Sequence, residues 1–131
     1  MNILIKETDT FKIEHDLDSD SILHTVKRFL ITEEWMDLLL TGQQYFVDND
    51  LSKWISNNRD LPIIHHNIDD WLFHEWLPDM VQEGWEKWAL VEPQISEGRK
   101  NQQKYQDSFQ KVGIEVRAFD QLDLAREWIK N

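Results

Sequence analysis

Cysteine is absent from this 131-residue chain. That absence excludes disulfide bonds, thiolate catalysis and cysteine-based zinc or iron–sulfur sites. Glycine occurs only four times, too rarely for a glycine-rich loop that cradles phosphate groups. The chain also lacks the G-x-G-x-x-G, P-loop and G-x-S-x-G patterns that place phosphates or a nucleophile. We therefore expect a protein that is not an enzyme and carries no cofactor.

Long hydrophobic runs are missing as well. No stretch approaches the roughly 18 apolar residues that a membrane-spanning helix needs. The apolar run at the start of the chain covers Ile3 to Ile5, which is too short for the core of a signal peptide. These features favour a cytoplasmic protein that does not enter a membrane.

Positive charge is scarce. Fourteen Lys and Arg residues stand against 25 Asp and Glu residues, which gives a formal net charge of −11. A surface of this sign repels the phosphates of nucleic acids and of anionic lipids. The composition disfavours nucleic-acid and membrane partners, and it suits basic partners or simple solubility.

Aromatic residues, in contrast, are plentiful, with seven Trp and six Phe. Each buried aromatic side chain removes roughly 150–250 Å² from water, so a chain of this length can build a substantial core. The length fits a single domain covering residues 1–131.

The hydrophobic periodicity predicts alternating strands and helices. Three strands open the chain, and four helices alternate with the remaining strands. Pro78 interrupts the second helix, where the missing N–H should kink it. The expected strands cover 3–6, 11–15, 22–30, 51–56, 87–92 and 114–119, and the expected helices cover 32–47, about 67–84, about 98–112 and 120–129.

This order predicts an α/β fold. Strands joined through helices run parallel, whereas the opening hairpin is antiparallel. The result is a mixed sheet of about five to six strands with an N-terminal antiparallel hairpin, parallel later strands and helices packed on the sheet.

Several segments resemble small bacterial STAS-like proteins, relatives of the SpoIIAA anti-sigma-factor antagonists. The segments are Ile31–Trp35, Ser52–Arg59, Trp76–Pro78, Trp85–Val91 and Gly113–Asp120. The resemblance implies a SpoIIAA-like mixed sheet, frequent dimerisation, and action through protein contacts or ligand capture. In that family a phosphorylatable Ser opens a helix beside an Asp. Here the corresponding Ser56 lies at a strand end with no such pair, so no functional residue is carried over.

Two sets of residues are candidates for contact with a partner or a ligand. Trp71 and Pro78 fall off the main apolar stripe of their helix, so they are candidates for a partner or homodimer surface. Packing of Trp71 under a neighbouring loop is the alternative. Trp54 and Trp76, with Trp85 and Trp88, are candidates for lining a cavity for a small apolar or amphipathic ligand, although such residues usually fill a core.

A weak metal candidate consists of His66, Asp70 and His74, with His65 beside it. Residues 70 and 74 share a helix face, and two imidazoles with a carboxylate suit Zn²⁺ or Fe²⁺. Ordinary surface positions explain the same residues.

Three hypotheses therefore remain. The first is a non-enzymatic STAS-like domain that binds another protein or itself as a homodimer. The second is a binding module for a small ligand. The third is a metal-dependent enzyme that uses His66, Asp70 and His74.

Overall fold

The chain opens with an antiparallel sheet. The computed structural model describes residues 1–62 and 66–131, and the side chain of His66 lies outside this description. Strands β1 (Asn2–Glu7), β2 (Phe11–Asp16) and β3 (Ser21–Val26) pair antiparallel in sequence order. Asp20, with a φ of 55°, lies in the turn between β2 and β3, in a conformation that Asp adopts more readily than most residues.

The third strand is shorter than the sequence predicts. It ends at Val26, not at residue 30. The alternating pattern continues to Leu30 because that side chain is fully buried. Leu30, however, belongs to the segment that connects β3 to α1 and not to a strand. A buried loop residue and a strand residue give the same sequence signal.

From β3 onward the chain alternates helix and strand. The sheet order is β1-β2-β3-β4-β5-β6, and the pairs from β3 to β6 are parallel. The α/β fold with a mixed sheet is therefore as predicted. The remaining elements are α1 (Thr32–Asp48), β4 (Lys53–Asn57), the 3₁₀ turn η1 (His66–Ile68), α2 (Asp69–Trp71), the π-helix η2 (Leu72–Trp76), α3 (Leu77–Gln82), β5 (Lys87–Val91), α4 (Ser96–Lys111), β6 (Glu115–Phe119) and α5 (Leu122–Ile129).

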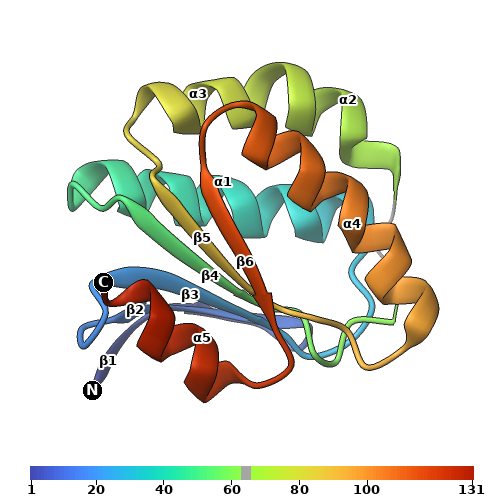
Figure 1. The fold of residues 1–131 in the computed structure, drawn as a ribbon, viewed down its shortest axis with the longest axis horizontal. Helices are drawn as coiled ribbons and strands as arrows, with labels where there is room; N and C mark the ends of the chain where they lie inside the picture. The colour runs from blue at the N-terminus through green and yellow to red at the C-terminus, as the bar shows by residue number, and fades with distance from the viewer. Residues whose placement is uncertain (63–65) are drawn as a thin grey trace.

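The helices form two unequal layers. Parallel crossovers are right-handed, and this strand order always advances in one direction, so the intervening helices fall on one face of the sheet. Figure 1 shows α1, α2, α3 and α4 above the sheet and α5 below it. The main core lies between the upper helices and the sheet. A smaller cluster, built around Leu23, Ile55 and Val91, lies beneath α5.

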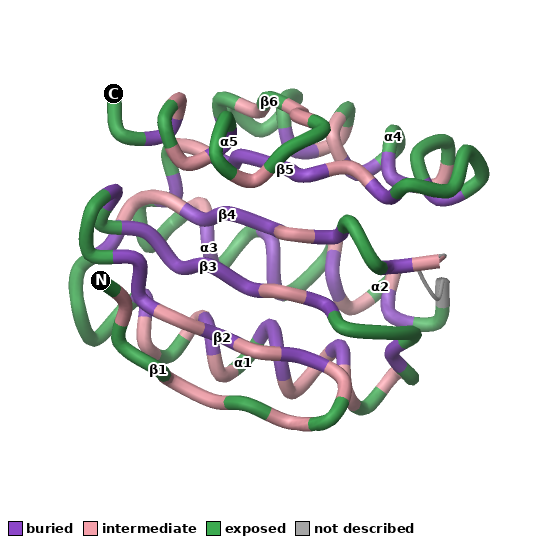
Figure 2. The backbone as a smooth tube through the Cα atoms, turned by 90° about the horizontal axis from the view of Figure 1, so that it is seen from below, coloured by how far each residue is buried: buried purple, intermediate pink, exposed green. Residues whose placement is uncertain are grey.

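The face below β1 and β2 has no helix over it among the described residues (Figure 2). Lys12 and Glu14 point to this side and are half-buried, whereas Phe11 and Ile13 on the helix side are buried. The alternation of polar and apolar residues in β2 therefore matches the uneven covering of the sheet.

Helix α1 is capped at its start by Ile31 and has one buried face. The Ile31 N–H donates to the Glu34 carboxylate, which also lies near the positive end of the helix. Leu40 is 47% exposed, whereas Leu38 and Leu39 are buried. The buried residues of the helix recur at three- and four-residue steps along one face: Trp35, Leu38, Leu39, Gly42 and Phe46.

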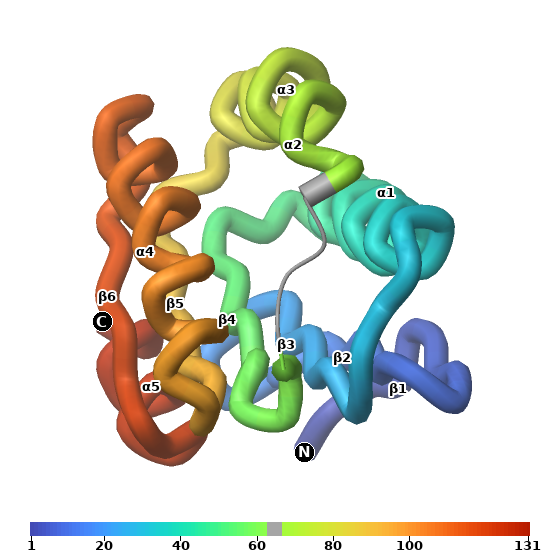
Figure 3. Tube along the Cα trace, turned by 90° about the vertical axis from the view of Figure 1, so that its right-hand side faces the viewer, coloured from blue at the N-terminus to red at the C-terminus, as the bar shows by residue number. Residues whose placement is uncertain are grey.

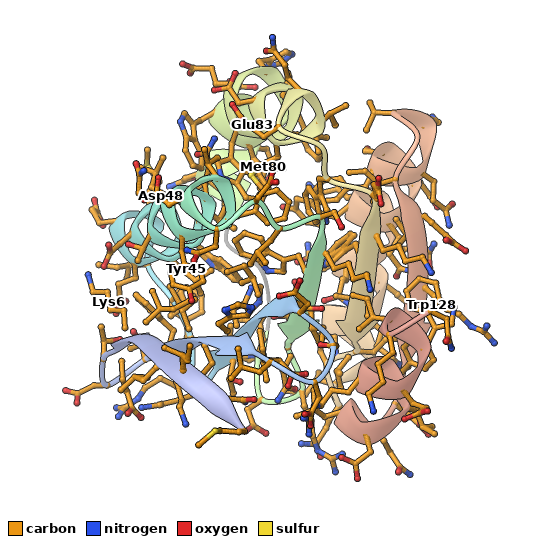
Figure 4. All side chains as sticks on the ribbon, turned by 90° about the vertical axis from the view of Figure 1, so that its left-hand side faces the viewer. Lys6, Tyr45, Asp48, Met80, Glu83 and Trp128 are labelled. Carbon is orange, nitrogen blue, oxygen red and sulfur yellow. The ribbon has the colours of Figure 1, made fainter. Side chains whose placement is uncertain are left out.

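The side chains of Tyr45 and Trp128 lie on opposite sides of the sheet (Figure 4). Tyr45 extends from α1 toward β2, where its hydroxyl forms a 2.8 Å hydrogen bond with Nδ1 of His15. Trp128 is on α5 and packs beside Phe119. None of the helices in the described ranges combines the length and apolar character of a membrane span.

Candidate functional site

A small cavity lies between the central strands and the upper helices, which arch over the sheet in Figure 3. Its volume is about 50 Å³. A water molecule occupies roughly 10–15 Å³ on this scale, so the space suits a few waters or one small chemical group. Half of the described lining residues are Trp, Tyr or Phe, namely Trp35, Trp54, Trp76, Trp85, Trp88, Tyr105 and Phe109, and the polar lining residues are His24, Ser56, Asn58 and Gln102.

The strand register brings the polar and aromatic lining together. His24 on β3 is opposite Ser56 on β4, and Trp54 on β4 is opposite Trp88 on β5. Because side chains alternate across a strand, positions 54 and 56 point to the same face as 24 and 88. Asn58 directly follows β4. The polar groups therefore lie toward the carboxyl ends of the parallel strands, where ligands commonly bind in α/β folds.

A chain of buried hydrogen bonds runs through these polar residues. The Trp54 indole N–H donates to Nδ1 of His24 at 2.9 Å, and Nε2 of His24 lies 2.9 Å from Oδ1 of Asn58. The Asn58 amide then donates to Oε1 of Gln102 at 2.8 Å. We call this series, Trp54–His24–Asn58–Gln102, the polar relay.

The direction of the polar relay is fixed at its first bond. An indole nitrogen only donates, so Nδ1 of His24 accepts and Nε2 carries the proton. Asn58 must then present its oxygen to His24 and its amide nitrogen to Gln102. Gln102 in turn presents its oxygen to Asn58, which leaves its Nε2 amide group pointing onward as a donor.

Burial keeps His24 uncharged. The side chain is 3% exposed, and this loss of hydration lowers the pKa of His24 from 6.5 to about 4, against a smaller upward effect from its bond to Asn58. A neutral imidazole is also what the polar relay requires, since Nδ1 must accept a hydrogen bond.

Two of the residues that line the cavity each carry a buried N–H donor with no acceptor among the described residues: Trp35 at Nε1 and Gln102 at Nε2. The indole groups of the other lining tryptophans are all satisfied. Trp54 donates to His24, Trp88 to Ser56 Oγ, Trp76 to the Leu39 carbonyl and Trp85 to the Lys87 carbonyl. Buried polar groups are nearly always paired, so the two exceptions in one cavity are informative.

The aromatic walls are held by edge-to-face contacts. The Trp54 and Trp76 rings are 5.7 Å apart at 89°, and the Trp76 and Trp85 rings are 5.6 Å apart at 74°. Such geometry is the preferred packing of aromatic pairs. It leaves little freedom for the walls to collapse onto the cavity.

The π-helix η2 supplies two of the wall residues, Leu72 and Trp76. Regular α-helical bonding is interrupted just before Pro78, which lacks the N–H that the preceding turn would use. The sequence predicts a kink at Pro78, and the structure has a wide π turn directly before the helix that contains it. Wide π turns occur often at functional sites because they redirect side chains.

Tyr105 closes one side of the cavity from α4. Its hydroxyl donates to Oδ1 of Asp69 at 2.5 Å, and Lys104 lies 2.6 Å from the other carboxylate oxygen. Burial and the neighbouring carboxylate raise the pKa of Tyr105. Its hydroxyl remains protonated and is committed to Asp69, so it does not act as a free base.

The structure places the four predicted contact residues in two settings. Trp54 and Trp76 line the cavity. Pro78 is exposed. Trp71 is half-buried and packs against the main core, and its place at a partner surface or under the neighbouring loop stays a prediction.

The metal candidate is only partly described. Asp70 and His74 are exposed, and Nδ1 of His74 donates to the Asp70 carbonyl oxygen at 2.9 Å. His65 and the side chain of His66 lie outside the described residues. Within the residues that are described, no group of three His, Asp or Glu side chains is arranged to hold a metal ion.

A second hollow, of about 490 Å³, lies at the carboxyl ends of β5 and β6. It contains two cations, Arg59 and Arg99, together with Glu92 and Asp120. Arg99 already donates to two backbone carbonyls, and Arg59 to one. The mixed charge and committed guanidinium groups make this hollow a weaker candidate than the aromatic cavity.

Four residues of the cavity were not predicted as site residues from the sequence: Trp35, His24, Asn58 and Gln102. The sequence did place His24 on the apolar side of its strand, between Ile22 and Val26. A histidine on the apolar face of a strand was the feature of the sequence that could have indicated a buried polar site. Gln102 gave no such indication, because it lies in a helix dominated by polar residues.

Comparisons with known proteins found no matching family model, no matching curated protein and no matching solved structure.

Proposed function

We propose that the protein is a non-catalytic binding domain that takes a small ligand into the aromatic cavity. The observation that carries this proposal is the pair of buried donors without acceptors, Trp35 Nε1 and Gln102 Nε2. An unpaired buried donor costs about 1–3 kcal/mol. A ligand that accepts from these groups removes that cost and stabilises the folded state.

The polar relay supports this role. Its residues are 1% to 4% exposed. Each residue from Trp54 to Gln102 is hydrogen-bonded to the next, and the group at the end of the series, Nε2 of Gln102, has no acceptor among the described residues. A network of this kind holds its terminal group in one orientation, as a recognition site requires. The neutral histidine and the committed tyrosine leave no general base among the described residues that line the cavity, which supports binding over catalysis.

Native mass spectrometry of the freshly purified protein tests the proposal. We expect a retained small molecule, and we expect Trp35→Phe to release it because that change removes the N–H while keeping a ring. Trp71→Phe is the matched control, since Trp71 does not line the cavity, and it should retain the ligand. A high-resolution crystal structure with ordered waters bonded to both donors, together with no retained molecule, would contradict the proposal.

We propose self-association through β1 as a second role, in line with the expected homodimer. β1 is an edge strand, and Ile3 and Leu4 on it are 47% and 56% exposed. Unprotected edge strands pair readily with other strands. Light scattering should detect a dimer that Leu4→Lys disrupts and that Leu124→Lys, on an equally exposed position of α5, does not. A monomer at high concentration would exclude this role.

A STAS-like relationship is consistent with both roles, because that family acts through protein contacts or ligand capture. The antiparallel first strands and parallel later strands support it. The metal-dependent alternative stays a prediction, and calorimetric titration with Zn²⁺ or Fe²⁺ tests it.

A further inference from the structure

Given the proposed ligand-binding function, we infer that the cavity selects an uncharged hydrogen-bond acceptor, such as the carbonyl oxygen of a ketone or an amide. The unpaired groups of the two lining residues are both donors. The indole N–H of Trp35 has no accepting mode. Gln102 in isolation has an oxygen to offer, but its oxygen already accepts from Asn58.

The polar relay prevents Gln102 from changing its role. Turning the Gln102 amide over would place its NH₂ group against the NH₂ group of Asn58. Turning Asn58 as well would place an NH₂ group against the protonated Nε2 of His24, whose tautomer Trp54 fixes. The relay therefore makes Gln102 a dedicated donor, and a ligand that only donates finds no partner at these two groups.

Charge on the ligand is also disfavoured. None of the described residues lining the cavity is cationic, since His24 is neutral and the lining otherwise consists of aromatic, aliphatic and uncharged polar groups. Transfer of an ionised carboxylate into such surroundings without a counter-charge is strongly unfavourable. The net charge of −11 opposes the approach of an anion over longer distances.

The volume limits the size of the group that enters. At about 50 Å³, the cavity admits a carbonyl with small apolar substituents, whose carbon atoms would contact the tryptophan rings. A larger ligand would place only such a group inside. The two donors and the aromatic walls together match a ligand group that has an accepting oxygen atom and apolar substituents.

Size-matched probes test this selectivity in the unaltered protein. Acetone offers an uncharged acceptor, acetate an anionic acceptor, and 2-propanol a hydroxyl that also donates. Titration into ¹⁵N-labelled protein at neutral pH follows the Trp35 indole N–H and the Gln102 side-chain amide directly. We expect acetone to shift both signals with a Kd at least about tenfold lower than that of acetate, with 2-propanol between them.

The outcomes of these titrations distinguish the inferred selectivity from the proposed ligand site. Acetate that binds as tightly as acetone would overturn the selectivity while supporting a ligand site. No shift from any probe, with both donors bonded to ordered water in a crystal structure, would overturn the ligand site itself.

Gln102→Glu provides an independent check, because the carboxylate still accepts from Asn58 but no longer donates. We expect acetone affinity to fall by about tenfold or more. Gln103→Glu carries the same charge change on an exposed neighbouring position of α4 and should leave acetone binding unchanged. Equal affinity in wild type and Gln102→Glu would contradict the assigned donor role.

Discussion

Trp54 occupies the centre of the aromatic interior, and its position depends on a glycine in α1. A Cβ atom added to Gly42 would lie 2.3 Å from Cη2 of Trp54, far inside van der Waals contact. The indole is 1% exposed and also starts the polar relay, so it has little room to move away. The absence of one side chain therefore positions both a core residue and the hydrogen bonds of the cavity.

We predict that Gly42→Ala destabilises the protein by about 1–3 kcal/mol, the usual effect of overpacking. The same change at an unhindered helix position would stabilise by up to about 1 kcal/mol, because Ala is the better helix former. Urea unfolding monitored by circular dichroism measures the free energy of unfolding. Gln44→Ala on the exposed side of α1 is the control, and a stabilised Gly42→Ala protein would contradict the predicted clash.

His24 makes stability depend on pH. Its pKa is about 4 in the folded protein, below the ordinary 6.5, so the unfolded chain binds the proton first as the pH falls. The contribution of His24 is fully present above pH 6.5 and is lost progressively down to about pH 4. The loss amounts to about 3 kcal/mol over that range.

Comparing wild type with His24→Gln across this pH range isolates the effect from that of the carboxylates. Gln keeps an acceptor for Trp54 and a donor for Asn58 but has no proton to bind, so its stability should fall less steeply. His74→Gln, at an exposed position, should follow wild type. Parallel curves for wild type and His24→Gln would show that His24 does not titrate as described.

At the scale of elements, α5 is attached to the sheet through an ion pair in which the Asp16 carboxylate is buried and the Arg126 side chain is 30% exposed. Nε and Nη2 of Arg126 each lie 3.0 Å from one oxygen of Asp16, a side chain with no exposed area. Burial raises the pKa of Asp16, but the bonds from Arg126 and Ser19 outweigh it, and the net effect is a lowered pKa. The bond connects α5 to β2, the strand that no helix covers on that side among the described residues.

Arg126→Ala should destabilise the protein by about 3–5 kcal/mol, because it leaves the Asp16 carboxylate buried without a counter-charge. Lys130→Ala removes an exposed pair with Glu127 and should change stability by less than about 1 kcal/mol. Thermal and urea unfolding of both variants test the difference. Equal effects of the two substitutions would show that the Asp16 pair contributes no more than a surface pair.

The elements were predictable from the sequence where one local pattern determined them. Alternation in residues 11–15 and the helical spacing from Trp35 to Phe46 each reflect burial against a single face. The polar relay was not predictable in this way, because its bonds join residues 34 and 44 positions apart. They depend on the register of β3 against β4 and on the placement of α4 that brings Gln102 to Asn58, and no short segment of the sequence determines either.

For the whole molecule, the excess of 11 negative charges should act against the folded state through self-repulsion. We predict that raising the salt concentration from very low to about 0.15 M, where the screening length is about 8 Å, increases the melting temperature. Differential scanning calorimetry at several NaCl concentrations measures this. A steady decrease would indicate that attractive ion pairs such as Arg126–Asp16 outweigh the overall repulsion.

The strand order also bears on how the chain folds during synthesis. Each new strand adds beside the one made before it, so the sheet can grow in the order in which it leaves the ribosome. The patch of Leu23, Ile55 and Val91 remains open until Leu122–Ile129 follow, because α5 is what covers it. A nascent chain stalled before Leu122 therefore presents an aliphatic surface to chaperones, and truncation at that point should yield an aggregating product.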